Sequence, residues 1–335
     1  MKRISIYDVA KNLNISASTV SRVLNNDKRI SEATRKKVLQ ELKRIKYMPN
    51  QYAKNLKNME NKNIGIFYTN HVHEKITPIH MNEKICGICS EIEKAGYNAS
   101  LFIRDYKEED IWDIVMKNNL CGILSLDRFD IEMSKNIMEY KIPHVQVNWH
   151  NDALPPDSYV SVENDAGQAI HILLEHLYQQ GYREIEVLYH HDTPLNDERA
   201  FHAIDSFKKG KKDISIIVTK SEIDFINPQK KEYQKQLQRH LEQGLKRAYL
   251  CTYYEHAYWL LDFAMKKGLR IPDDIAVVTQ NYDDIFSLFH PIMTGTKQLL
   301  YEIGSMAAKK LLSVIQGNQE TTVFVTPELY IGESS

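Results

Sequence analysis

Residues 4–25, ISIYDVAKNLNISASTVSRVLN, decide the fold of the N-terminal part of the chain. Ser5 and Ser16 can each cap a helix, and apolar residues after each of them recur at helical spacing. Asn14 supplies a turn residue between the two segments. Two short helices that share an apolar seam across a tight turn are typical of a helix-turn-helix, whose second helix enters the DNA major groove.

The outward side chains of the second helix suit contact with bases. Ala17 and Ser18 are small, and Arg22 carries a planar fork that matches N7 and O6 of guanine. Short polar side chains are expected to contact phosphates and thereby set the register. These are Ser16, Thr19, Ser21 and Asn25. The alternative is a solvated helix pair with ordinary caps, which occurs in many globular proteins.

Length and charge both indicate a separate N-terminal module. A chain of 335 residues is too long for one compact core and predicts two or three domains. Residues 1–60 hold 14 Lys and Arg against 5 Asp and Glu, whereas the remainder holds 29 against 39. A basic head on an acidic body is typical of a phosphate-binding module joined to another domain.

The sequence predicts a reduced, cytoplasmic protein with no membrane attachment. The start, MKRISIYDVA, lacks the apolar run of a signal peptide, and no stretch is long and apolar enough to cross a bilayer. Four cysteines do not make a disulfide framework in a chain of this size.

A third helix is predicted over residues 31–45, with Ser31 as its cap. Its charged residues are expected to form a solvated face: Arg35, Lys36, Lys37, Lys43 and Arg44. Pro49 then ends the helical run. The polar segment 50–58 is too short to be a stable helix alone, so it is either a linker or a hinge that becomes helical on DNA.

The run YDVAKNLNISASTVSRVLN, followed by SEATRKKVLQELKRIKYMPNQYAKNLK, resembles the DNA-binding head of the lactose-repressor/galactose-repressor (LacI/GalR) family of bacterial regulators. The resemblance implies that the hinge helices of a dimer pair in the minor groove. Leu56 stands where the family wedges a leucine into the central base step, and bending of the duplex offsets the cost of unstacking. The junction and hinge residues assigned to DNA in this way are Tyr47, Asn50, Ala53, Leu56 and Lys57.

After residue 63, apolar strand candidates alternate with helical runs. Repeated strand–helix units predict parallel sheets covered on both faces, and their two sets indicate two doubly wound α/β subdomains. The predicted strands are 64–69, 98–103, 121–126, 144–148, 159–162, 185–189, 214–219, 247–252 and 275–280. The predicted helices are 81–95, 108–118, 130–140, 164–180, 197–209, 229–243 and 255–268.

The family resemblance, weaker here, implies the type I periplasmic-binding-protein fold, with a last helix (297–316) in the first lobe and a last strand (322–330) in the second. The expected domains follow. They are a head at 1–60 with its hinge helix at 50–58, and a body at 61–335 whose first lobe spans about 62–161 and 291–321 and whose second lobe spans about 162–290 and 322–333.

Ligands of doubly wound sheets bind outside the carboxyl ends of the strands, so residues just after strands are effector candidates. They are Asn148, Trp149, Glu163, Arg199, Tyr253, Tyr254 and Asn281. The resemblance of ERAFHA to a family motif places the effector-contacting arginine at Arg199. Asn148 and Asn281 depart from the aspartates of many members, and Tyr254 departs from the family pattern as well.

One guanidinium, one carboxylate, two amides and three aromatic rings favour a neutral carbohydrate as the effector. An anionic effector would ask for more positive charge than Arg199 supplies. A purine, nucleoside or sugar phosphate is the alternative.

Other motifs in the sequence are weaker indications of function. Cys86 and Cys89 form a CxxC near several histidines, but both thiols are expected to act as small apolar groups in a helix, and no metal is predicted. His190-His191 follows a strand without a nucleophile elbow. There is no Walker motif and no GxGxxG fingerprint, so neither an enzyme nor a cofactor is expected.

The sequence therefore predicts a homodimeric repressor of a carbohydrate operon, bound to a pseudo-palindromic operator and switched by a small molecule between its lobes. Induction and corepression both remain open. The chain ends without an apolar heptad tail, which predicts a dimer rather than a tetramer. The rivals are a solute-binding protein, a catabolite regulator that binds a phosphorylated carrier protein, and an enzyme on a doubly wound fold.

Overall fold

The computed structural model describes most of the chain outside several connecting segments. The described residues are 6–24, 27–45, 62–68, 78–103, 111–126, 129, 131–148, 155, 158–190, 198–221 and 247–335. The expected roles of Ser5, Asn25, Trp149, the junction and hinge residues from Tyr47 to Lys57, His191 and the helix at 229–243 lie outside these residues. The chain divides into two compact units, residues 1–163 with 300–323 and residues 164–299 with 324–335, each described by itself.

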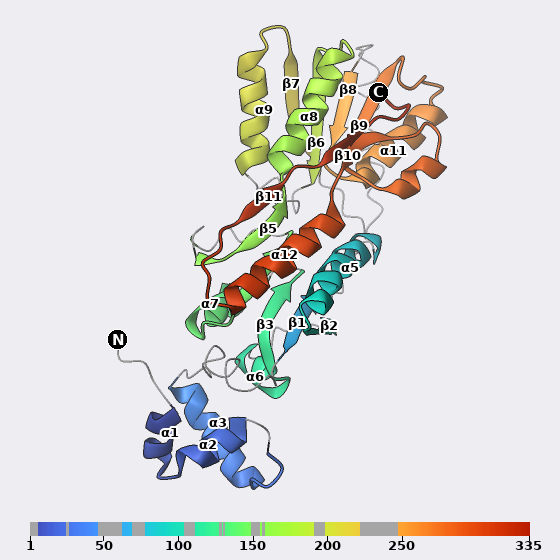
Figure 1. Ribbon diagram of the computed structural model, residues 1–335. Coiled ribbons are helices and arrows are strands. Elements are labelled where there is room, and N and C mark those ends of the chain that lie inside the picture. Colours follow the sequence, from blue (N-terminus) through green and yellow to red (C-terminus); the bar gives the residue numbers. More distant parts are fainter. Residues whose placement is uncertain are drawn as a thin grey trace. The chain divides into compact units, whose positions relative to one another are not determined.

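The head consists of α1 (Ile6–Leu13), α2 (Ala17–Leu24) and α3 (Glu32–Arg44) (Figure 1). The predicted caps of the last two helices are present: the Oγ of Ser16 accepts from the amide of Thr19 at 3.1 Å, and Ser31 caps α3. Asn14 makes the turn with φ of 52°, in the left-handed region that asparagine tolerates. The core of the head is formed by buried aliphatic side chains of the three helices: Val9, Val20, Val23, Val38 and Leu42.

The predicted solvated face of α3 is wrong at one position. The Arg35 side chain is only 16% exposed, and its guanidinium donates to the carbonyl of Asp27 at 2.9 Å and to that of Val23 at 3.5 Å. These carbonyls lie at and beyond the end of α2, where helical acceptors have lost their partners, and a cation satisfies them. Arg35 therefore holds the C-terminal end of α2 against α3.

A six-stranded sheet in the order β11-β5-β4-β3-β1-β2 lies mostly in the first unit, and only the last residue of β5 and the last two of β11 are counted with the second. Neighbours from β2 to β5 pair in parallel. Its strands are β1 (Asn63–Tyr68), β2 (Asn98–Ile103), β3 (Leu120–Ser125), β4 (His144–Val147), β5 (Ser161–Asn164) and β11 (Val323–Val325). Its helices are α5 (Pro78–Lys94), α6 (Ile111–Lys117), α7 (Ile131–Glu139) and α12 (Leu300–Ile315).

The second unit repeats this plan, with its strands in the order β12-β10-β9-β8-β6-β7. All its described pairs are parallel except β10 with β12. Its strands are β6 (Glu184–His190), β7 (Ser215–Ser221), β8 (Arg247–Cys251), β9 (Ile275–Tyr282), β10 (Thr294–Lys297) and β12 (Glu328–Tyr330). Its helices are α8 (Ala166–Gln179), α9 (Glu198–Gly210), α11 (Tyr254–Lys266) and the 3₁₀ helix η3 (Asp284–Leu288).

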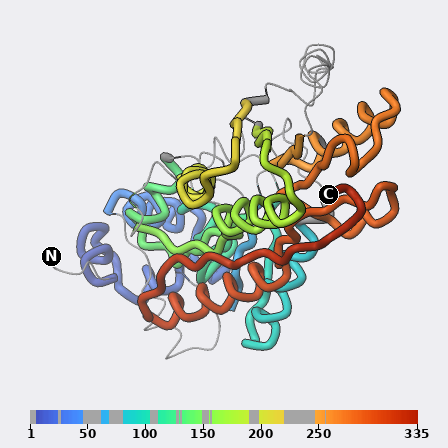
Figure 2. The backbone as a smooth tube through the Cα atoms, turned by 90° about the horizontal axis from the view of Figure 1, so that it is seen from above, coloured from blue at the N-terminus to red at the C-terminus, as the bar shows by residue number. Residues whose placement is uncertain are grey.

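The C-terminal elements follow the expected plan only in part. As predicted, α12 belongs to the first unit, where it packs beside α5 (Figures 1 and 2). The predicted last strand, however, is two strands in different sheets, because Pro327 lies between them and has no amide to continue a ladder. Residues 291–299, expected in the first lobe, belong to the second unit because β10 pairs with β9.

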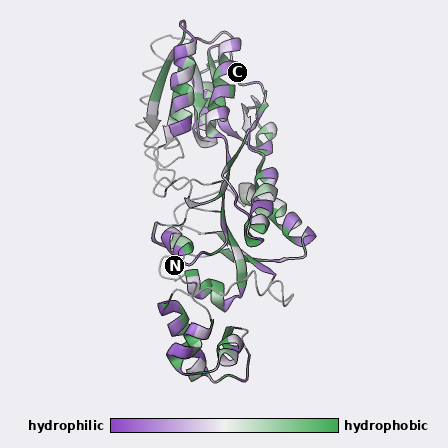
Figure 3. Cartoon of the chain, turned by 60° about the vertical axis from the view of Figure 1, so that its left-hand side comes forward, coloured by the Kyte–Doolittle hydropathy of each residue, from purple (hydrophilic) through white to green (hydrophobic). Residues whose placement is uncertain are grey.

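Apolar strands form the interior of both units. In Figure 3 their strands are mainly green, whereas the helices have purple and green sides. All six residues of β3 and all five of β8 are buried, as expected for parallel strands covered on both faces. The helices α5 and α12 approach each other closely: a Cβ on Gly87 would overlap the carbonyl of Tyr301, and one on Gly304 would overlap that of Lys84.

Candidate nucleic-acid interface and effector site

The outer face of α2 presents the side chains expected to read DNA. Val20 and Val23 are buried against the head, whereas Ser18 and Arg22, one turn apart, are exposed. Thr19 and Ser21 are half-buried, and Ala17 packs against the apolar cluster of the head. The surface of α2 therefore combines one guanidinium with short polar groups, which allows the helix backbone to approach base edges closely.

Hydroxyl groups gather at the start of α2. The Ser16 Oγ lies 2.7 Å from that of Ser18 and 2.8 Å from Oγ1 of Thr19. The first amides of a helix and its dipole favour an anion at this end. A DNA phosphate is such an anion, and contacts of this kind hold the register of the helix in the groove.

Asp27, an acidic residue near Arg22, is already paired with Arg29. Arg29 donates to both carboxylate oxygens of Asp27, at distances from 2.7 to 3.2 Å, and these hydrogen bonds hold the pKa of Asp27 well below its usual range. The Arg22 side chain makes no hydrogen bond with the described residues. Its fork is therefore available to an acceptor outside the chain.

In the first unit, two predicted effector residues lie on neighbouring strands. Asn148 follows β4 with φ of 63°, and its amide donates to the carbonyl of Val162 at 2.7 Å. Glu163 lies within β5 rather than after it, is only 4% exposed, and accepts a short hydrogen bond from Ser161. The β4–β5 pairing brings Asn148 and Glu163 together.

In the second unit, Arg199 lies in the first turn of α9. Its guanidinium carbon is 3.5 Å from the ring centroid of Phe324, and one terminal nitrogen is buried. Stacking on an aromatic face holds a guanidinium in one plane and leaves its edge for hydrogen bonds. Phe324 was missed by the sequence analysis because nothing in the run VFV marks it as a partner of a residue 125 positions earlier.

The remaining predicted residues lie at the carboxyl ends of β8 and β9. Asn281 is inside β9, not beyond it: its Nδ2 donates to the carbonyl of Thr252 at 3.2 Å, and its Oδ1 accepts from Gln298 at 2.6 Å. Tyr253 precedes α11, and Tyr254 packs against Phe286 with centroids 5.2 Å apart. The strand order reverses between β6 and β8, so this edge is where doubly wound sheets bind ligands.

A serine–histidine pair lies in the first unit. Oγ of Ser125 is 2.8 Å from Nε2 of His144, and the imidazole stacks on Phe129. Ser125 is fully buried, so the pair does not present a nucleophile to a substrate. Burial lowers the pKa of His144 to about 3, which keeps the ring neutral.

We expect His144 to contribute to the loss of folding stability as the pH falls. Between about pH 6.5 and pH 3 the unfolded chain binds a proton at His144 that the folded chain does not, so stability rises with pH in that window. The contribution is at most about 1.4 kcal/mol per pH unit. His144→Gln, which can still bond Ser125, should flatten the decline of the urea midpoint between pH 6.5 and pH 5. An unchanged decline would contradict this assignment.

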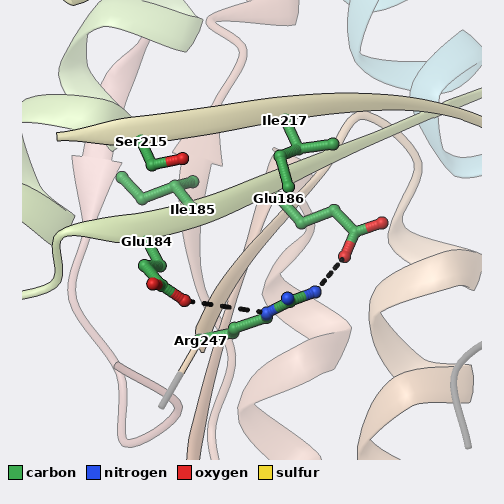
Figure 4. A pocket seen from close by; sticks show the side chains of 6 residues that line it. All are labelled: Glu184, Ile185, Glu186, Ser215, Ile217 and Arg247. Carbon is green, nitrogen blue, oxygen red and sulfur yellow. Dashed lines mark ion pairs between the residues drawn. The ribbon is translucent and has the colours of Figure 1, made fainter. Parts of the chain in front are cut away.

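The described residues also form a small pocket of about 90 Å³ at the amino ends of β6, β7 and β8 (Figure 4). Arg247 lies between two acids there, 3.9 Å from Glu184 and 3.6 Å from Glu186. Glu186 is buried and accepts from Thr219 at 2.7 Å. This pocket is at the opposite end of the strands from Tyr253 and Asn281 of the same unit, and its charges are paired with one another.

Two negative findings concern the described residues only. No three His, Cys, Asp or Glu side chains among them gather as metal ligands. No described helix is long and apolar enough to span a bilayer.

Family models match both parts of the chain. Residues 5–50 match the model described as bacterial regulatory proteins, lacI family. Residues 174–335 match that of a periplasmic binding protein-like domain. A curated relative, the probable HTH-type transcriptional repressor ExuR of Bacillus subtilis, is 28% identical over 328 residues, which cover 93% of this chain and 92% of that protein.

Solved structures share the fold. A complex of the transcriptional regulator CelR with cellobiose superposes with a TM-score of 0.70 at 19% identity, covering 99% of this chain and all of that one. The lac repressor dimer bound to operator and the anti-inducer ONPF superposes with a TM-score of 0.64 at 19% identity, covering 99% of each chain. The chain therefore joins a helix-turn-helix domain of the lacI family of bacterial regulatory proteins, residues 5–50, to a periplasmic binding protein-like domain, residues 174–335.

Proposed function

We propose that the protein is a DNA-binding transcription regulator that acts in the cytoplasm as a homodimer and represses a carbohydrate-utilisation operon. The outer surface of α2 carries this proposal, because Ser18 and Arg22 are exposed on a capped helix of a strongly basic head. Two such heads related by a twofold axis fit a pseudo-palindromic operator. ExuR, the relative described above, is named as a repressor.

We further propose a sugar as the effector, and the candidate contacts in the second unit are Arg199, Tyr253 and Tyr254. Polar groups with two hydrogen-bonding atoms and aromatic faces suit a ring that carries hydroxyls. The described complex of CelR contains cellobiose, a sugar. A purine is the second candidate, because another relative, from Histophilus somni, bears the name PurR and is 25% identical over 342 residues.

Effector binding would couple to DNA binding through a change between two states of the dimer. A coupling free energy of about 1–3 kcal/mol is typical of such regulators and must be reciprocal, so DNA would change the effector affinity by the same factor. The predicted wedge, Leu56, and its neighbours in the hinge remain proposals, as do Tyr47, Asn50 and Lys57.

The test combines two measurements on the full chain. Thermal-shift screening against a panel of sugars, nucleosides and sugar phosphates identifies a ligand that binds the folded state and raises its melting temperature. Gel-shift titration on the promoters beside its own gene, with and without that ligand, measures regulation. Binding of no promoter under either condition would refute the proposed function.

Arg199→Ala should abolish the response to effector while leaving operator affinity unchanged. The reason is that Arg199 and its stacking partner Phe324 both belong to the second unit, whereas the head that would contact DNA belongs to the first. Arg183 provides a matched control, since its guanidinium also stacks on a ring, 3.8 Å from the centroid of Tyr178, but pairs with Asp213 in the turn before β7. Arg183→Ala should keep the full response. A normal response in Arg199→Ala would place the effector elsewhere.

Two rival functions are less well supported. A solute-binding protein would not need a basic head with an exposed reading helix. An enzyme would need an accessible catalytic group, whereas Ser125, the serine paired with a histidine, is fully buried.

A further inference from the structure

Cys86 and Cys89 lie three residues apart in α5 and differ in exposure. Cys86 is exposed and Cys89 is half-buried, whereas Cys121 and Cys251 are buried. The prediction that both thiols of the CxxC act as apolar packing groups is therefore wrong for Cys86. An accessible thiol beside a shielded one is the arrangement of an attacking and a resolving cysteine.

The spacing of the two residues permits a bond between them. Residues three apart in an α-helix have Cα atoms about 5 Å from each other. Disulfides join Cα atoms that are usually about 4.4–6.8 Å apart. Burial raises the pKa of Cys89, and the neighbouring Cys86 and Glu93 raise it further.

We propose that Cys86 and Cys89 form a reversible disulfide within α5, with a low-molecular-weight disulfide as the oxidant. The Cys86 thiolate attacks one sulfur of that disulfide, forms a mixed disulfide and releases one thiol. Cys89 then loses its proton to solvent, attacks the Cys86 sulfur and releases the second thiol. The two cysteines are oxidised by two electrons, and the small disulfide is reduced to two thiols.

The close packing of α5 on α12 would strain this disulfide and so make it easy to reduce. Gly87 lies between the two cysteines, and the backbone of α12 at Tyr301 is so close that a Cβ on Gly87 would overlap it. In a disulfide the Cβ atoms are about 3.8 Å apart, closer than an undistorted helix places residues three apart. Closing the bond therefore distorts the turn that packs on α12. Strained disulfides are readily reduced and act as switches rather than structural links.

The test treats the reduced full-length protein with oxidised glutathione and follows it by intact mass and thiol titration. The wild type should lose two thiols and the mass of two hydrogen atoms, and dithiothreitol should restore both. Cys89→Ser should stop at the mixed disulfide and gain one glutathione moiety. Cys86→Ser should react on the order of tenfold more slowly, because its remaining α5 thiol is shielded.

A melting curve supplies a second readout. The oxidised wild type should melt below the reduced form, whereas Cys86→Ser should melt at the same temperature before and after treatment. A mixed disulfide that persists in the wild type, a covalent dimer on a non-reducing gel, or retention of all thiols would each overturn the proposal. None of these measurements involves DNA, so their outcome is separate from that of the proposed regulation.

Discussion

Arg22→Ala is expected to weaken operator binding by roughly 2–6 kcal/mol for a dimer, because each head loses about 1–3 kcal/mol of contact with one base pair. The fall in affinity is then from about 30-fold to more than about 10,000-fold. The side chain is exposed on α2 and makes no hydrogen bond with the described residues, so the loss reflects DNA contact and not unfolding of the head. Gel-shift titration at fixed salt measures it.

Two controls separate base reading from charge. Arg22→Lys keeps the charge but removes the fork, so it should lose most of the sequence preference. Lys36→Ala removes an exposed cation from α3 and should weaken binding slightly and equally on all sequences. If Arg22→Ala lost the same affinity for operator and for random DNA, Arg22 would contact phosphate and not a base.

Glu186→Ala is expected to lower the free energy of unfolding of the second unit by about 3–5 kcal/mol, because it leaves Arg247 buried without its closest acid. The side chain of Glu186 is 3% exposed and that of Arg247 is 10% exposed. The change also removes the acceptor of Thr219. Urea unfolding followed by circular dichroism measures the effect.

Glu184 is the matched control, because it pairs with the same arginine but is 46% exposed. Glu184→Ala should cost less than about 1 kcal/mol, as exposed pairs do. The double variant Glu186→Leu with Arg247→Met should recover most of the loss, since an apolar replacement of a buried pair is often neutral. Equal losses for Glu184→Ala and Glu186→Ala would show that burial does not set the strength of this pair.

Much of the fold follows from local pattern. The caps Ser16 and Ser31, the turn at Asn14 and the strand at 98–103 were all predicted, because they depend on neighbours within a few residues. The 3₁₀ helix at 284–288 and the strand β10 were missed. Their lengths of five and four residues give too few repeats for periodicity to detect.

In the candidate sites, too, some features follow from local sequence and others depend on distant segments of the chain. Exposure of Ser18 and Arg22 follows from the helical period of α2. The surroundings of Arg199, Asn281 and Arg35 do not, since each bonds or stacks on a segment at least eight residues away. Sequence spacing also placed Glu163 and Asn281 after their strands, whereas ladder pairing with neighbouring strands extends both strands past them.

The sequence by itself determined a capped, basic reading head and two parallel-sheet subdomains, because helix caps and apolar periodicity act over short distances. Only the tertiary structure decided that the strands on either side of Pro327 join different sheets and that Phe324 lies beneath Arg199. Strand partners and side-chain stacks of this kind are selected by surfaces that meet only after the chain has folded.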